Sequence, residues 1–335
     1  HVAPVLDKMG WHPEKDEAGA AYWIAKNDWD RCVEIGTPAV APLIETIRAG
    51  YSSHKEPAIE ALSRIDWQPG VDEAGAIYWI SKRKWNRCVE IGTPAVQPLI
   101  DALMNTTEQE GATKALGEIG APAVAPLIAA LRDWSIERKH KKAAMALGEI
   151  GAPAVAPLAA ALKGWNKSER MRAALALGEI GAPAVEPLTE VLKDWSKAER
   201  IAVVEILERI GWQPAMDEVG AIYWADKQRW DKCEEIGTQA VSPLVAALKA
   251  GGWDERWAIA QALERIGWQP EMDKAGAIYW IVKRNWDECV GIGTPAVVPL
   301  TEALSTGYEV QAAAEALERI GWQPDRSEAA AIYWL

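Results

Sequence analysis

The 335-residue chain contains no phenylalanine, four histidines and four cysteines. His1, His12, His54 and His140 are scattered, and none is followed directly by Glu. The chain also has no Gly-rich phosphate loop, no Cys-x-x-Cys pair and no Gly-x-Ser-x-Gly nucleophile turn. We therefore expect no catalytic site, no metal and no cofactor, so that the protein is not an enzyme.

The chain has no run of 18 or more apolar residues, and no basic-then-apolar segment opens it. Lys and Arg number 36 against 48 Asp and Glu, for a net charge of −12. Proteins that bind nucleic acid in general rely on Lys and Arg to neutralise phosphates, so this balance makes nucleic acid an unlikely partner. We expect a soluble, cytoplasmic protein with no membrane partner.

The four cysteines occupy one recurring slot, three residues before the Ile of an Ile-Gly pair: Cys32, Cys88, Cys233 and Cys289. The nearest pairs are 56 residues apart, which corresponds to two layers of the repeat described below. Layers of packed helices are about 8–10 Å apart, and a disulfide needs Cα atoms within about 7 Å. We therefore interpret all four as small core residues, with reactive thiols as the alternative.

One stretch dominates what is present: Ala-Leu-Gly-Glu-Ile-Gly-Ala-Pro-Ala-Val-Ala-Pro-Leu at 115–127. It returns unchanged at 146–158, and at 176–188 with Glu186 as the only difference. Its glycine is placed for a left-handed helix C-cap, and its first proline for the first turn of the next helix. The second proline removes one intrahelical hydrogen bond and should kink or delay that helix. The stretch thus predicts a helix, a corner and another helix.

Related corners recur every 26–31 residues, which fits two helices and two short loops. This predicts an all-α solenoid of about eleven two-helix units across residues 1–335. The corner positions are Gly10, Gly36, Asp66, Gly92, Gly120, Gly151, Gly181, Gly211, Gly237, Gly267, Gly293 and Gly321.

Two kinds of unit alternate in the outer parts, 1–92 and 211–335, whereas 93–210 contains only the plain kind. The second kind opens with Trp-Gln-Pro, as at Trp67, and continues Asp-Glu-Ala-Gly-Ala-Ile-Tyr-Trp. Asp72 should cap its first helix, and Trp85, Cys88 and Val89 should share one side of its second. Neither end of the chain supplies a polar capping unit. We expect a fragment of a longer protein, or self-association through the uncapped ends.

The repeats resemble the HEAT-like repeats named after the phycobilisome lyases. The resemblance rests on Ala-Leu-Gly-Glu-Ile-Gly-Ala-Pro-Ala-Val-x-Pro-Leu and on helices such as Arg170–Ala174. It implies a right-handed α-α superhelix in which the second helix of each pair lines the concave face. The histidine pattern offers no counterpart of the His-Glu iron ligands of the HEAT-like deoxyhypusine hydroxylases.

Residues 132–172 hold nine Lys and Arg against four Asp and Glu. Aligning second helices on their central leucine places His140, Arg170, Arg200 and Arg256 in one column and Lys142 and Arg172 in an adjacent one. Such columns suit an acidic peptide or a phosphate group. The alternative is an internal ladder in which the arginines pair with acids such as Asp133 and Asp194.

The 19 tryptophans also fall in recurring slots, a consequence of repeat duplication. Trp67, Trp79 and Trp85 and their equivalents are interpreted as packing between repeats, with groove-lining anchors as the alternative. Trp134, Trp165 and Trp195 lie at polar turns of the plain repeats, where we expect a partly exposed row.

The preferred hypothesis is a non-catalytic scaffold that binds a partner protein or peptide along the concave groove, through the two basic columns and the row of turn tryptophans. A bilin-lyase component is the alternative implied by the family name. A nucleic-acid-binding HEAT protein using the central basic residues comes third.

Overall fold

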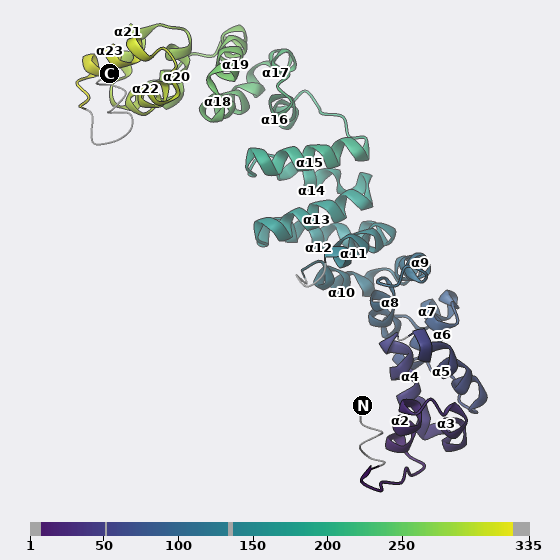
Figure 1. Cartoon of the computed structure of the whole chain (residues 1–335). Coiled ribbons are helices and arrows are strands. Elements are labelled where there is room, and N and C mark those ends of the chain that lie inside the picture. The colour runs from purple at the N-terminus through teal and green to yellow at the C-terminus, as the bar shows by residue number, and fades with distance from the viewer. Residues whose placement is uncertain (1–7, 51, 133–136, 324–335) are drawn as a thin grey trace. The chain divides into compact units, whose positions relative to one another are not determined.

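The computed structural model describes residues 8–50, 52–132 and 137–323, and in these ranges every regular element is a helix (Figure 1). The predicted all-α architecture is confirmed for the described residues. By contacts between Cα atoms the chain divides into two compact units, residues 1–188 and 189–335. Each unit is described by itself below.

The first unit consists of helix pairs in chain order. Its helices are α2 (Glu17–Ala25), α3 (Trp29–Ile35), α4 (Val40–Ala49), α5 (Ser52–Arg64), α6 (Glu73–Ser81), α7 (Trp85–Ile91), α8 (Val96–Ala102), α9 (Gln109–Ile119), α10 (Ala121–Arg132), α11 (Glu137–Ile150), α12 (Val155–Gly164) and α13 (Lys167–Ile180), with 3-10 turns η1 (Thr37–Ala39), η2 (Thr93–Ala95), η3 (Ala152–Ala154) and η4 (Ala182–Ala184).

Helix α14 (Val185–Glu190) spans the division between the units. The second unit contains α15 (Lys197–Ile210), α16 (Glu218–Asp226), α17 (Trp230–Ile236), η5 (Gly237–Ala240), α18 (Val241–Ala250), α19 (Trp253–Ile266), α20 (Lys274–Val282), α21 (Trp286–Ile292), α22 (Thr294–Thr306) and α23 (Val310–Ile320).

The corner of the plain repeats differs from the prediction in one respect. Gly151 has a positive φ of 73°, as expected, but its ψ of −131° lies outside the left-handed helical region. The same holds at Gly120 and Gly181. This conformation sends the chain directly into the 3-10 turn η3, and the α-helix begins only at Val155. The predicted delay is confirmed for Pro157, which lies in the first turn of α12, where an N–H has no intrahelical partner. Pro126 instead lies inside α10, which begins at Ala121 without a 3-10 turn.

The corner before a Trp-Gln-Pro segment has the left-handed geometry instead. Gly211 has φ 87° and ψ 17°. Its N–H donates to the Glu208 carbonyl at 2.9 Å, and the Trp212 N–H donates to the Leu207 carbonyl at 3.0 Å. These two bonds form a Schellman motif. The array thus uses two kinds of corner, which share a glycine but differ in ψ by about 150° by the values of Gly151 and Gly211.

The Trp-Gln-Pro units contain a close backbone approach at the start of their first helix. Asp72 caps α6 as predicted, and its Oδ1 accepts from the Gly75 N–H at 2.8 Å. A Cβ added at Gly75 would lie 2.1 Å from the Gly70 carbonyl oxygen. The equivalent approach at Gly276 is to the Glu271 carbonyl oxygen, at 1.9 Å. A side chain at Gly75 or Gly276 would therefore clash with the backbone.

The aromatic residues of these units pack against the cores and against one another. Trp67 and Tyr78 contact the buried cluster around Leu43 and Leu62, with their rings edge to face at 5.6 Å. Trp85 lies against the backbone of α9, because a Cβ added at Gly111 would meet its indole at 2.0 Å. These contacts support the packing interpretation of Trp67 and Trp85.

No single described helix is long and apolar enough to cross a membrane. The segments 139–150 and 152–164, bent by 119° at their junction, meet the length and composition criteria only when taken together.

We expect Gly276→Ala to lower the free energy of unfolding by about 1–3 kcal/mol or more, because the methyl group clashes with a backbone carbonyl that cannot rotate away. Gly164→Ala is the matched control. Gly164 ends α12 with nothing within 4 Å of an added Cβ, so alanine should be neutral or stabilise by up to about 1 kcal/mol. Urea unfolding followed by circular dichroism measures both variants. Equal stability of Gly276→Ala and the parent chain would contradict the close approach.

Candidate partner-binding surface

The predicted column of basic residues lies on the amino-terminal turns of the second helices α11, α13, α15 and α19. Arg256 is only 2% exposed, and His140, Arg170 and Arg200 are half-buried. Both members of the adjacent column, Lys142 and Arg172, are half-buried too. The basic side chains of the column are therefore only partly accessible to a ligand.

Arg200 is held at its edge by groups of the second unit. Its Nε and Nη2 donate to the two carboxylate oxygens of Asp226 at 2.7 and 2.8 Å, and its Nη1 donates to the Trp195 carbonyl at 3.0 Å. The Asp226 side chain is 5% exposed. This bidentate pair joins α15 to the end of α16. It supports the internal-ladder alternative, although the acid is Asp226 and not Asp194.

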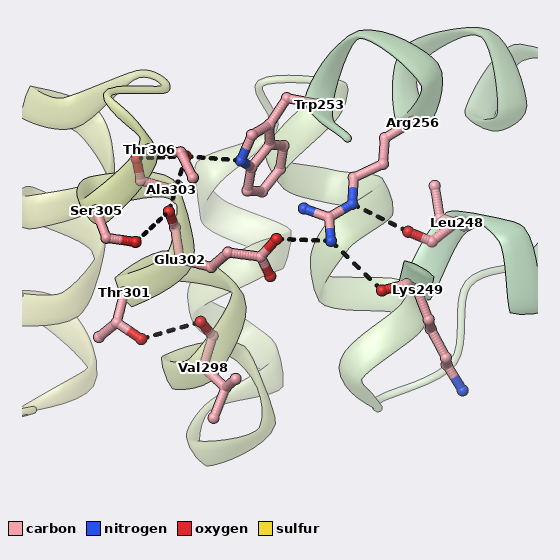
Figure 2. Close-up of polar contacts among 10 residues, drawn as sticks. All are labelled: Leu248, Lys249, Trp253, Arg256, Val298, Thr301, Glu302, Ala303, Ser305 and Thr306. Carbon is pink, nitrogen blue, oxygen red and sulfur yellow. Dashed lines mark hydrogen bonds and ion pairs between the residues drawn. The ribbon is translucent and has the colours of Figure 1, made fainter. Parts of the chain in front are cut away.

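Arg256 makes the corresponding link with different partners. Its Nε donates to the Leu248 carbonyl at 3.0 Å, and its Nη2 lies 2.8 Å from the Glu302 carboxylate. Its guanidinium carbon lies 4.3 Å from the centre of the Trp253 ring. Figure 2 shows the guanidinium between the end of α18, the indole of Trp253 and Glu302 from α22.

The central basic residues also contact the protein itself. Arg172 donates from Nη1 to the Leu131 carbonyl at 3.0 Å. Lys142 lines a cleft of about 260 Å³ between α8, α10 and α11. Binding of a partner by His140, Lys142, Arg170, Arg172, Arg200 and Arg256 stays a prediction.

The expected row of partly exposed tryptophans is wrong for Trp195. This side chain is only 6% exposed, because the turn folds it back onto the core. Trp165 is half-buried, with the guanidinium carbon of Arg132 5.2 Å from its ring centre. Trp134 lies outside the described residues.

The residues exposed on the second helices are different ones. In the first unit, Met145 on α11 is 37% exposed and Leu175 on α13 is 45% exposed. Each lies two residues before a fully buried leucine, and α11 and α13 pack side by side (Figure 1). Met171, half-buried, lies one turn before Leu175. Together these three residues form an apolar stripe across two neighbouring second helices, which we call the 145/175 stripe.

Charged residues of opposite sign border Met145 in the 145/175 stripe. Lys141 is exposed one turn before Met145, and Glu149 is exposed one turn after it. Neither α11 nor α13 has a basic residue in its last turn. The helix dipole favours cations at the carboxyl end by about 0.3–1 kcal/mol each, so an acid there costs stability.

The second unit exposes its own apolar residues on second helices. Ile201 on α15 is 41% exposed, and Trp257 on α19 is 52% exposed. Both lie six residues before a buried leucine, so they occupy the same register. Sequence reasoning missed these residues because an apolar residue in a helix is ordinarily assigned to the core.

The four cysteines are buried and free of disulfides, as predicted. The thiol of Cys32 donates to the Ala20 carbonyl at 3.7 Å, and Cys233 donates in the same way to Ala221. Burial raises the pKa of Cys32 to about 11 and that of Cys233 to about 12. Among the described residues no group of three His, Cys, Asp or Glu side chains is arranged to hold a metal.

The family model of the PBS lyase HEAT-like repeat matches residues 108–133, 141–164 and 169–194. The central repeats are PBS lyase HEAT-like repeats. Each matched segment contains the second helix of one pair, the plain corner and the first helix of the next pair. The predicted family is thus confirmed at the centre of the array, where the 145/175 stripe also lies.

No curated protein matches the chain. A solved structure described as "Circular tandem repeat protein with novel repeat topology and enhanced subunit contact surfaces" is 15% identical, with 90% of this chain and 74% of that chain covered. Its TM-score of 0.21 is too low for the likeness to inform the function.

Removal of the Arg200 guanidinium should leave the Asp226 carboxylate buried without its partner. We expect Arg200→Met to lower the free energy of unfolding by about 2–4 kcal/mol, less than for a fully buried pair because the Arg200 side chain is 24% exposed. Arg200→Met combined with Asp226→Leu should recover most of the loss. The matched control is Arg229→Met, which removes the pair with Asp231 at the surface and should leave the urea midpoint unchanged. A loss no larger than in this control would contradict the proposed role of the bidentate pair.

The four thiols should resist alkylation in the folded protein. The raised pKa values leave little thiolate at pH 8, and burial blocks access. Iodoacetamide labelling followed by intact-mass measurement should show no adduct in buffer and four adducts in urea. Rapid labelling of any cysteine in buffer would favour the alternative of a reactive thiol.

Proposed function

We propose that the chain is a non-catalytic protein–protein interaction scaffold whose second helices bind a partner protein or peptide. The observation that carries this proposal is the 145/175 stripe. Exposed apolar residues are ordinary when scattered, whereas contiguous ones commonly mark interaction sites. Here Met145 and Leu175 occupy the same register on two packed helices, and Met171 lies one turn before Leu175.

The charge order around the stripe supports the same proposal. Lys141 and Glu149 border Met145 on opposite sides, and Glu149, in the last turn of α11, opposes the helix dipole. A partner with complementary charges would offset that cost and fix its own direction on the surface. We therefore expect the partner to combine apolar anchors with acidic and basic side chains at opposite ends.

The proposal is tested by affinity capture from a lysate of the organism that encodes the chain, at low and at high salt, with identification by mass spectrometry. The double variant Met145→Lys, Leu175→Lys should lose the captured protein at least tenfold. Val298→Lys is the control, because Val298 is 58% exposed on the first helix α22 and should not contribute.

Apolar contacts persist at high salt, whereas exposed charge pairs are screened. The scaffold proposal therefore requires a protein that is retained at both salt concentrations and is lost in the double variant. Capture of nucleic acid alone, or equal capture by the parent chain and the double variant, would contradict it.

A further inference from the structure

The basic column marks a niche that recurs in the second unit. Arg200 and Arg256 each lie seven residues before a buried leucine, and a shift of 56 residues relates their surroundings. Around Arg200 the niche is a pocket of about 310 Å³ between α15, α16 and α18. We call it the open socket.

Around Arg256 the same niche is occupied by the protein's own side chains, so we call it the filled socket (Figure 2). The indole of Trp253 lies over the Arg256 guanidinium at 4.3 Å and donates from Nε1 to the Thr306 hydroxyl at 2.9 Å. Tyr308 stacks on the Trp253 ring, with centroids 4.5 Å apart and planes within 5°. This niche therefore accommodates an aromatic ring between the guanidinium and α22.

The difference between the sockets comes from three substitutions to smaller or more flexible residues. Lys197 stands in the open socket where Trp253 stands in the filled one. Ala246 replaces Glu302, and Ala250 replaces Thr306. The residues that line the pocket therefore include no indole and no carboxylate at these positions, whereas the filled socket has both.

Of the three groups that contact the indole in the filled socket, the open socket keeps the guanidinium, whereas Ala250 and Gly252 stand in place of Thr306 and Tyr308. Arg200 is fixed at its edge by Asp226 and the Trp195 carbonyl, which leaves a flat face for stacking. Ile222 and Pro243 supply apolar lining, and Ser242 adds a hydroxyl. The exposed pair Lys193–Glu218, at 2.9 Å, borders the opening.

The first unit contains a further copy of the niche. Lys55 lies seven residues before the buried Leu62, and the chain has Ser52 where Trp253 stands 201 residues later. There too a pocket is found, of about 360 Å³, with Asp101 and Asn105 in its lining. The copies around Lys55 and Arg200 both lack the tryptophan and both have a pocket.

We propose that the open socket binds a tryptophan side chain of the partner protein, stacked on Arg200 as Trp253 stacks on Arg256. This inference rests on the proposed function, because the occupant belongs to the bound protein. The partner's ring would occupy the position that Trp253 fills in the filled socket, where the open socket has Lys197.

The site is tested with 5-fluoroindole as the probe and the full chain, by fluorine NMR, which the chain's own tryptophans do not obscure. We expect saturable broadening of the probe signal with the parent chain. Lys197→Trp, which installs the residue of the filled socket, should weaken binding at least tenfold, and Ala246→Glu should do the same by a second route. Lys197→Ala is the control and should retain binding. Circular dichroism and urea unfolding establish that each variant is folded.

Absence of binding to the parent chain, or equal binding to Lys197→Trp and Lys197→Ala, would overturn the socket. The source of the ring is tested by affinity capture with Lys197→Trp, which should lose the partner that the parent chain retains. Loss of the probe without loss of the partner would overturn a partner tryptophan as the occupant while the scaffold function stands. Failure of the parent chain to capture any protein would instead contradict the proposed function itself.

Discussion

Close approach between neighbouring backbones is the constraint on which the array depends. In the plain repeats a Cβ added at Gly117 would lie 2.9 Å from the Glu149 Cβ, and one added at Gly148 would lie 2.9 Å from the Glu179 Cβ. Buried alanines, among them Ala143 and Ala173, fill the same interface. Helices that approach so closely leave no room for large side chains between them.

Much of the fold was predictable from the sequence, because the period of the glycine corners and the proline spacing depend on local backbone chemistry. The N-cap role of Asp72 and the core role of Cys88 follow from patterns within one helix and are confirmed. The ψ of Gly151 was not predictable, since a glycine suits both kinds of corner.

The candidate site was less accessible from the sequence, because exposure and pairing depend on residues far apart in the chain. Arg200 finds its acid 26 residues later, on a helix of the other kind of unit. The residues around Trp195 are polar, as is typical of an exposed turn, but Trp195 itself is buried. Met145 and Leu175 are apolar and stand next to buried residues in the sequence, and their exposures of 37% and 45% show that they face outward. The contact of Trp253 with Arg256 could be recognised only from the positions of both side chains in the structure.

The close approach of Gly276 to the Glu271 carbonyl has a practical consequence for rearranging the array. The Glu271 carbonyl of the loop packs closely against Gly276, so the loop and the helix α20 should be kept together in any rearrangement. Deletions, fusions and grafts that cut between them would pair a loop with a helix it was not built to touch. Junctions placed at the open corner of Gly293, where nothing lies within 4 Å of an added Cβ, avoid that conflict and allow whole units to be exchanged.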